Sequence, residues 1–189
     1  MIHQPTEHIE DPNVALQMLK AGNERYLKGE LIEKRDYKEA RTALANEQKP
    51  FAVILTCSDS RVPPEIFFDQ KLGNIFTIRN AGNIADMTAL GCIEYAVNKL
   101  KTRLIVVCGH SNCGAVIAAH SGEDFSPNIT HIVEHIKPAV EMGGNVEEVI
   151  HNNIKRMVEQ IKANEVVAGL EATVVGAWYD IYTGEVHWL

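Results

Sequence analysis

Two short runs of branched apolar residues decide the fold, Phe51-Ala-Val-Ile-Leu55 and Leu104-Ile-Val-Val-Cys108. Runs of this kind are typical of strands buried inside a parallel sheet. A polar motif follows each run at once. The motifs are Thr56-Cys57-Ser58-Asp59-Ser60-Arg61 and Gly109-His110-Ser111-Asn112-Cys113-Gly114. Because ligands of open sheets bind beyond the carboxyl ends of the strands, we expect both motifs to contribute to one site.

The chemistry of these motifs indicates a metal site. Cys57, Asp59, His110 and Cys113 offer two thiolates, one carboxylate and one imidazole. Such a soft, roughly tetrahedral set favours Zn²⁺ over Mg²⁺ or Ca²⁺, which prefer oxygen ligands. Taken alone, Cys57 is equally well explained as a buried structural thiol. The pairing of two motifs, each after a strand, is what favours the metal site.

A phosphatase-like loop is disfavoured, because the Cys57-to-Arg61 interval is too short for one and contains an acidic residue. The other two cysteines have a simpler interpretation. Cys92 falls on an expected helix and Cys108 inside an apolar strand, so both are expected in the core. A chain with no export signal makes metal binding or free thiols a better explanation of four cysteines than disulfides.

The rest of the chain alternates strands with helices, which predicts an α/β fold with a mostly parallel sheet flanked by helices. Strands are expected at 51–55, 74–79, 104–108 and 171–180. Helices are expected at 12–27, 36–46, 63–68, 86–100 and 113–120, with one or two more across 129–163, broken near Pro138 and Gly143-Gly144.

We expect residues 1–189 to form a single domain, with an N-terminal helical arm at 1–46 and an α/β core at 47–189. Asp11 and Pro12 suit the cap and first turn of the arm's first helix. The apolar positions of 12–27 recur at helical spacing, and this stripe needs a surface to cover it. A partner subunit is one such surface.

Composition excludes several classes. The 189 residues carry a net charge of −7, with 46% hydrophobic and 23% charged residues, and no basic run, which disfavours nucleic-acid binding. No apolar stretch approaches the ~20 residues needed to cross a membrane. The N-terminus lacks the features of a secretory signal, so a cytoplasmic location is expected.

Beyond this chemistry, the chain resembles the β-class carbonic anhydrases, and among them the plant-like subgroup whose site is usually open. The resemblance covers about residues 12–189. It rests on Cys57-Ser58-Asp59-Ser60-Arg61-Val62-Pro63, Arg79-Asn80-Ala81-Gly82-Asn83, Glu94-Tyr95-Ala96-Val97, the run from Val107 to Ala115, and Tyr179-Asp180-Ile181-Tyr182-Thr183-Gly184.

The resemblance implies one zinc per chain, bound by Cys57, His110 and Cys113. It also implies a catalytic pair, Asp59 and Arg61. In an open site Asp59 pairs with Arg61, and in a closed site Asp59 is the fourth zinc ligand. The implied activity is reversible hydration of carbon dioxide to bicarbonate and a proton, by attack of zinc-bound hydroxide.

A substrate pocket is implied as well. Gln48 matches a residue that hydrogen-bonds substrate, Phe76 and Tyr95 match apolar pocket walls, and Ala81 stands where a small residue is usual. The N–H of Gly114, at a helix start, is expected to steady negative charge on a substrate oxygen. In this subgroup several pocket residues come from the neighbouring subunit, so a homodimer or larger homo-oligomer is expected.

Two alternatives stay open from the sequence. Relatives that hydrolyse carbon disulfide or carbonyl sulfide keep the same ligands, so the substrate is less specified than the metal. A non-catalytic zinc-thiolate protein, structural or sensory, is the alternative from a different class. The Asp59–Arg61 pair favours the enzyme, because a structural site has no need of it.

Overall fold

The structure, a computed structural model, describes residues 8–32 and 37–189. Residues 1–7 of the expected arm and residue 36, the expected start of its second helix, lie outside the described residues. The strands are β1 (Ala52–Cys57), β2 (Ile75–Asn80), β3 (Leu104–His110), β4 (Thr173–Tyr179) and β5 (Val186–Trp188). They form one sheet in the order β2-β1-β3-β4-β5.

The sheet is mostly parallel, as predicted. Strands β1 to β4 run parallel, and β5 pairs antiparallel with β4. Every residue of β1 and β3 is buried, which explains their uninterrupted apolar runs. The register places Cys57 beside Asn80 of β2, and His110 beside Tyr179 of β4. The ends of both motif-bearing strands therefore lie at the same edge of the sheet.

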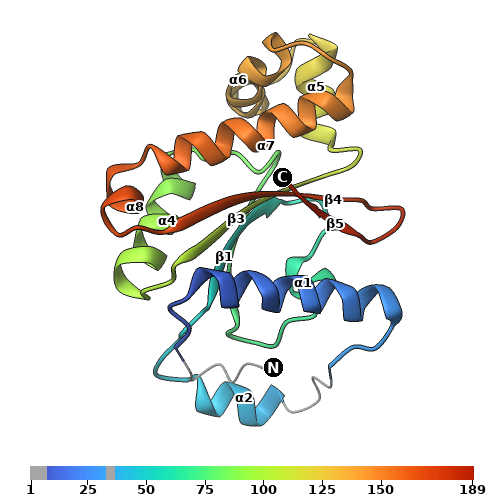
Figure 1. Cartoon of the computed structure of the whole chain (residues 1–189). Helices are drawn as coiled ribbons and strands as arrows, with labels where there is room; N and C mark the ends of the chain where they lie inside the picture. Colours follow the sequence, from blue (N-terminus) through green and yellow to red (C-terminus); the bar gives the residue numbers. More distant parts are fainter. Residues whose placement is uncertain (1–7, 33–36) are drawn as a thin grey trace.

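Helices cover both faces of the sheet (Figure 1). They are α1 (Pro12–Lys28), α2 (Tyr37–Ala43), α3 (Pro64–Phe67), α4 (Met87–Lys99), α5 (Gly114–Ser121), α6 (Pro127–Glu141), α7 (Val146–Lys162) and α8 (Glu165–Gly169). Helix α1 packs on α3, β1 and β3, whereas α4 packs on β1 and β2, and α7 on β3 and β4. Helices α5 and α6 stack beyond α7 and form the upper lobe of Figure 1.

Helix α1 begins where the sequence predicts and ends one residue later than expected, at Lys28. The Asp11 side chain accepts the N–H of Asn13, Pro12 occupies the first turn, and Gly29 closes the helix in the left-handed conformation. Its apolar stripe, which includes the fully buried Leu19, packs against its own chain. A partner subunit is thus not required to cover α1. By contrast, α2 has no buried residue.

The expected break near Pro138 is wrong. Helix α6 continues through Pro138 to Glu141, although proline removes one helical hydrogen bond. Ile136 and Ala139, on either side, are fully buried, so packing in the upper lobe holds this turn helical. The break at Gly143-Gly144 is confirmed, since both glycines have positive φ, 83° and 107°.

Two short elements escaped sequence analysis, β5 and α8. Strand β5 is held by Asn23 of α1, which accepts the N–H of Val186 and donates to the carbonyls of Gly184 and Phe67. This buried amide can form four side-chain hydrogen bonds, and three of them are formed here; one acceptor site is left over. The core prediction holds for Cys108, which is fully buried, while Cys92 is only half-buried.

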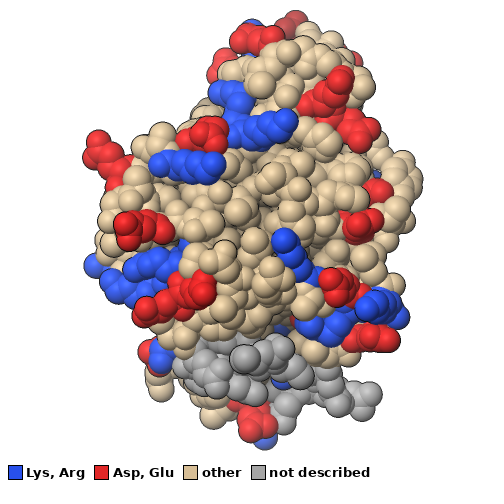
Figure 2. Space-filling model, viewed as in Figure 1, with Lys and Arg blue, Asp and Glu red and all other residues tan. Residues whose placement is uncertain are grey.

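The surface carries charges of both signs. Figure 2 shows lysines, arginines and acidic residues interspersed on the viewed face, without a large area of one sign. Among the described residues, no helix has the length and apolar character that crossing a bilayer demands.

Candidate metal centre

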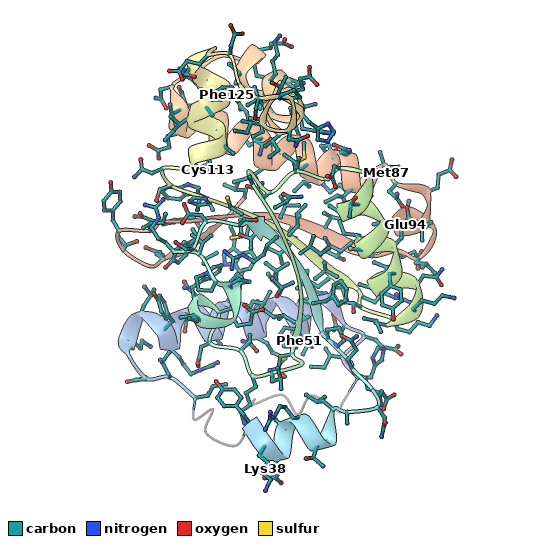
Figure 3. All side chains as sticks on the ribbon, turned by 180° about the vertical axis from the view of Figure 1, so that it is seen from behind. Lys38, Phe51, Met87, Glu94, Cys113 and Phe125 are labelled. Atoms are coloured by element: carbon teal, nitrogen blue, oxygen red, sulfur yellow. The ribbon has the colours of Figure 1, made fainter. Side chains whose placement is uncertain are left out.

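Three predicted ligands come together at the carboxyl edge of the sheet. Cys57 is the last residue of β1, His110 the last of β3, and Cys113 the N-cap of α5. Figure 3 shows Cys113 where the chain passes from the sheet to α5. All three are buried, and their ligand atoms lie within 4.8 Å of one another. No other set of three potential ligands clusters in this way within residues 8–32 and 37–189.

The spacing of the sulfurs fits a tetrahedral ion. The Sγ atoms of Cys57 and Cys113 are 3.9 Å apart. Two thiolates each ~2.3 Å from a tetrahedral zinc lie roughly 3.8 Å apart, so the observed separation needs almost no adjustment.

The imidazole of His110 is set for coordination through one nitrogen. Its Nδ1 lies 2.9 Å from the carbonyl oxygen of Ser111, so Nδ1 carries the proton and donates it there. The other nitrogen, Nε2, is buried and has no hydrogen-bond partner among the described residues. A buried acceptor without a partner costs free energy, and a metal ion would satisfy it.

The thiols of the site differ from the core thiol in their proton affinity. The pKa of Cys57 is lowered to about 4, chiefly because the thiol of Cys113 donates a hydrogen bond to it. The pKa of Cys113 is raised, because it holds that shared proton and is buried. Burial raises the pKa of Cys108 to about 12, against a smaller opposing effect of Thr56. A divalent cation would displace the shared proton and make both site sulfurs thiolates.

Two glycines allow the close packing around the cluster. A Cβ at Gly109 would come within 2.6 Å of Ile154 of α7. Gly82 has φ +77° and donates its N–H to the sulfur of Cys57 at 3.4 Å. The carbonyl of Gly82 accepts from the buried amide of Asn153 at 2.9 Å. Helix α7 therefore supports the loop that hydrogen-bonds the first ligand.

Asp59 lies with Arg61 and outside the ligand cluster. Its Oδ1 accepts from Nε of Arg61 at 2.9 Å, and its Oδ2 from Nη2 at 2.7 Å. The backbone N–H of Arg61 also donates to Oδ1 at 2.9 Å. These bonds, led by those from the arginine side chain, hold the pKa of Asp59 well below its usual range. The carboxylate therefore stays ionised across the neutral range.

Arg79 supports the loop that follows the first ligand. In the sequence it stood out only as the first residue of Arg79-Asn80-Ala81-Gly82-Asn83, one of the runs that carry the family resemblance. Its guanidinium donates to the carbonyl of Cys57 at 2.9 Å and to that of Asp59 at 2.5 Å. It thus fixes the loop between the first ligand and the Asp59–Arg61 pair. The charge of Arg79, near the end of an expected strand, is the one sequence signal that could have identified this role.

The predicted substrate residues fall into two groups. Ala81 precedes Gly82, and Gly114 directly follows Cys113, so both lie at the metal edge. Gln48 and Tyr95 instead line one open hollow, and the rings of Tyr95 and Phe76 are 6.3 Å apart.

The second group is separate from the ligands of its own chain. Phe76 stands beside Val53, four residues before Cys57. At ~3.3 Å per residue this is roughly 13 Å along the strand from the ligand. The structure therefore gathers Gln48, Phe76 and Tyr95 but does not bring them to the metal cluster of the same chain.

The fold and the site together define an α/β protein with a thiolate–imidazole metal centre at the ends of its parallel strands. Comparison with known families makes the class specific. The family model described as carbonic anhydrase matches residues 52–186. The chain thus belongs to the β-class carbonic anhydrase family, which makes it an enzyme of that family and confirms the resemblance seen in the sequence.

Individual relatives agree with the family. The carbonic anhydrase of Mycolicibacterium smegmatis is 39% identical, over 93% of this chain and 92% of the relative. Carbonic anhydrase 2 of Mycobacterium tuberculosis is 38% identical, over 92% and 91%. Among solved structures, a tetrameric β-carbonic anhydrase of Sordaria macrospora is 25% identical with a TM-score of 0.74, covering 94% of both chains. A β-carbonic anhydrase of Aspergillus fumigatus is 26% identical with the same score, covering 94% and 89%.

Proposed function

We propose that this protein catalyses the reversible hydration of carbon dioxide to bicarbonate and a proton, at one Zn²⁺ per chain held by Cys57, His110 and Cys113. The observation that carries this proposal is the buried Cys–His–Cys cluster, with His110 Nε2 free to coordinate, beside an ionised Asp59. Zinc bound there would supply the Lewis acidity that turns water into a nucleophile at neutral pH.

The residues around the ion must contribute, because two thiolates and a neutral imidazole leave the centre with about zero net charge. Such a centre acidifies water less than a three-histidine site does. Asp59 is the residue that would accept a hydrogen bond from the O–H of the attacking species. This bond would orient the lone pair of the attacking oxygen toward the substrate carbon. Arg61 keeps Asp59 ionised and oriented, since both carboxylate oxygens face its guanidinium.

The arrangement of the Asp59–Arg61 pair also supports placing this chain in the open-site subgroup. A carboxylate with both oxygens engaged by a guanidinium must break those bonds before it can ligate a metal. We therefore infer that Asp59 remains with Arg61 in the resting enzyme.

Substrate contacts are proposed to come from two subunits. Ala81 and the N–H of Gly114 stand at the metal edge of the same chain, where Gly114 at the N-terminus of α5 can stabilise developing negative charge. Gln48, Phe76 and Tyr95 form their own group, and their distance from the cluster of the same chain supports their supplying a neighbour's site.

A homodimer or larger homo-oligomer follows, since the pocket is otherwise incomplete. The solved relative from Sordaria macrospora is described as tetrameric. The division into an N-terminal arm, 1–46, and a core, 47–189, is part of this proposal. Within the arm, α2 has no buried residue and is therefore proposed to contact a partner subunit. The cytoplasm remains the proposed location.

Stopped-flow measurement of carbon dioxide hydration by the zinc-loaded protein tests the activity. We expect saturable hydration that disappears when the metal is removed by a chelator and returns with Zn²⁺. The same sample assayed with carbon disulfide and carbonyl sulfide tests the alternative substrates. Stoichiometric zinc with no turnover of any of the three would support the non-catalytic zinc-thiolate protein instead.

A further inference from the structure

The two residues between the ligands His110 and Cys113 are both held by a turn at the far end of the chain. Ser111 donates its backbone N–H to the carbonyl of Tyr179 at 3.0 Å. Its hydroxyl oxygen accepts the N–H of Ile181 at 2.9 Å and donates to Oδ1 of Asp180 at 3.4 Å. Ser111 thus bonds to the last residue of β4 through its backbone N–H, and to the turn that follows β4 through both functions of its hydroxyl.

Asn112 is held by the same turn. Its backbone has φ +54°, the left-handed conformation, which asparagine adopts more readily than most other non-glycine residues. Its side-chain amide donates to the hydroxyl of Tyr182 at 2.9 Å. Tyr182 is 82% exposed, so this hydroxyl contact, rather than burial of its ring, fixes the pair.

Asp180 organises the turn. Its Oδ1 accepts the N–H of Tyr182 at 2.9 Å, and its Oδ2 accepts the hydroxyl of Thr183 at 3.0 Å. Its backbone carbonyl accepts the N–H of Gly184 at 2.8 Å, and its N–H donates to the carbonyl of Glu185. One carboxylate therefore shapes the turn and bonds to the ligand loop at the same time.

We propose that the turn Asp180–Gly184 is a positioning element of the metal centre, with Asp180 and Tyr182 as its positioning residues. The carbonyl that accepts from Nδ1 of His110 belongs to Ser111, which the turn holds. Cys113, the N-cap of α5, directly follows Asn112, whose side chain is hydrogen-bonded to Tyr182 of the turn. Through these two residues the turn fixes the imidazole and the second sulfur relative to Cys57.

The turn also lies beside the catalytic pair. The pKa of Arg61 is raised mainly by its hydrogen bonds with Asp59, and the side chain of Tyr182 is close enough to add a smaller electrostatic effect. Tyr182 is thus within electrostatic reach of Arg61 and in hydrogen-bond contact with the ligand loop. None of its atoms is needed to touch the substrate for this role.

This inference rests on the proposed zinc site, and its test therefore uses readouts other than turnover. Four variants are compared with the wild type: Asp180→Ala, Asp180→Asn, Tyr182→Phe and, as a matched control, Tyr37→Phe. Tyr37 is 53% exposed on α2, away from the ligand loop. Zinc release to a chromogenic chelator and the electronic spectrum of the Co²⁺-substituted protein are measured for each, together with thermal unfolding.

Asp180→Ala is expected to speed zinc release by about 10- to 100-fold and to change the Co²⁺ ligand-field bands, as loss of an outer-shell partner does. Asp180→Asn should restore most of both properties, because an amide can accept from Ser111 and Tyr182 and donate to Thr183. Tyr182→Phe should speed release by about 2- to 10-fold, the effect of one hydrogen bond. Tyr37→Phe should match the wild type.

Zinc release and Co²⁺ spectra unchanged in both Asp180→Ala and Tyr182→Phe would overturn the proposal. Tyr182→Phe removes one exposed oxygen, so it decides the question even if Asp180→Ala proves unstable. A wild-type protein that binds zinc without hydrating carbon dioxide, but loses zinc faster in these variants, would refute the proposed function and uphold the positioning role.

Discussion

Asp59 and Arg61 are joined by three hydrogen bonds, two from the guanidinium and one from the backbone N–H, and together they occupy both carboxylate oxygens. Cys57, two residues earlier, lies in the ligand cluster. The arginine therefore competes with any bound metal for the same carboxylate. Which of the two partners Asp59 keeps decides whether a coordination position stays open for water.

Asp59→Asn should leave zinc bound and lower carbon dioxide hydration by ~10²-fold or more, the size typical of lost acid–base groups. An amide cannot orient the nucleophile as the carboxylate does, and it gives up the ion pair with Arg61. Metal analysis and stopped-flow hydration on the same sample measure both effects. Loss of zinc in this variant would mean that Asp59 is a ligand at rest.

The wild-type pH profile should show no step from Asp59 between pH 5 and 9. Its folded-state pKa is depressed below the ordinary ~4, so the stabilisation from its pair with Arg61 is fully present above that value and is lost only in stronger acid. Activity should instead rise with pH as the nucleophile ionises. Metal spectroscopy at pH ~6 and ~9 should find the same ligands, and an Asp59–metal bond at pH ~8.5 would contradict the open site.

Cys57→Ala and Cys113→Ser should each lose the metal, because two of the three ligands with the right chemistry come from these thiols. Cys92→Ser is the matched control and should retain one zinc per chain, since Cys92 stands on α4, away from the cluster. Elemental analysis after dialysis gives the stoichiometry. Full occupancy in both ligand variants would remove the basis of the assignment.

The two-subunit pocket predicts complementation between inactive chains. Cys57→Ala lacks a ligand, and Gln48→Ala lacks a substrate contact, so each homo-oligomer should be strongly impaired. In a mixed dimer, the Gln48→Ala chain supplies the intact metal ligands and the Cys57→Ala chain supplies Gln48. One of the two sites of that dimer is therefore complete. Mixing the two after mild dissociation should therefore restore activity, up to about one site in four for random pairing of dimers. Sedimentation checks assembly; an active monomer, or mixing without recovery, would argue against a shared pocket.

His151 should make the protein less stable as the pH falls through ~6.5, the ordinary histidine value. Desolvation by burial lowers its pKa, and its Nε2 is buried without a partner among the described residues. The unfolded chain then binds more protons than the folded one in this range, so unfolding is favoured by acid.

His151→Phe should flatten this dependence, because phenylalanine can keep the edge contact with Trp178, whose ring lies 5.4 Å away. Urea unfolding of the zinc-loaded proteins at pH 7.5 and 5.5 provides the comparison. An equal loss of stability in wild type and variant would show that another group is responsible.

Gly22 and Gly91 offer a matched test of helix packing. A Cβ at Gly22 of α1 would lie 1.9 Å from the backbone oxygen of Phe68, whereas a Cβ at Gly91 of α4 meets nothing within 4 Å. Gly22→Ala should destabilise the protein by at least ~1–3 kcal/mol, the cost of overpacking. Gly91→Ala should stabilise it by up to ~1 kcal/mol, since alanine is the better helix former. Similar effects in both would mean that α1 does not pack on Phe68.

Much of the fold was predictable because local signals and tertiary structure agree. The apolar runs at 51–55 and 104–108 are strands since both faces of β1 and β3 are covered, and the motifs after them meet since parallel strands end at one edge. Donor chemistry pointed to Cys57, Asp59, His110 and Cys113, and the family resemblance implied Cys57, His110 and Cys113 as the ligands; the structure brings these last three together.

What the sequence did not reveal depends on partners distant in the chain. Strand β5 has three residues and exists because Asn23 and β4 bind it. Helix α6 passes Pro138 because its neighbours bury Ile136 and Ala139. The support from Arg79 to the carbonyls of Cys57 and Asp59 depends on the register of β1 with β2, which no local pattern contains.

The amide of Asn23 joins two parts of the chain that are synthesised far apart in time. It binds the backbone at Gly184 and Val186, 161 and 163 residues later in the sequence. During translation α1 leaves the ribosome well before β5, so Asn23 lacks these two partners until β5 has emerged. A nascent chain cannot form these bonds until Val186 has been synthesised, so a chain that ends before Gly184 lacks two of the three backbone partners of this amide.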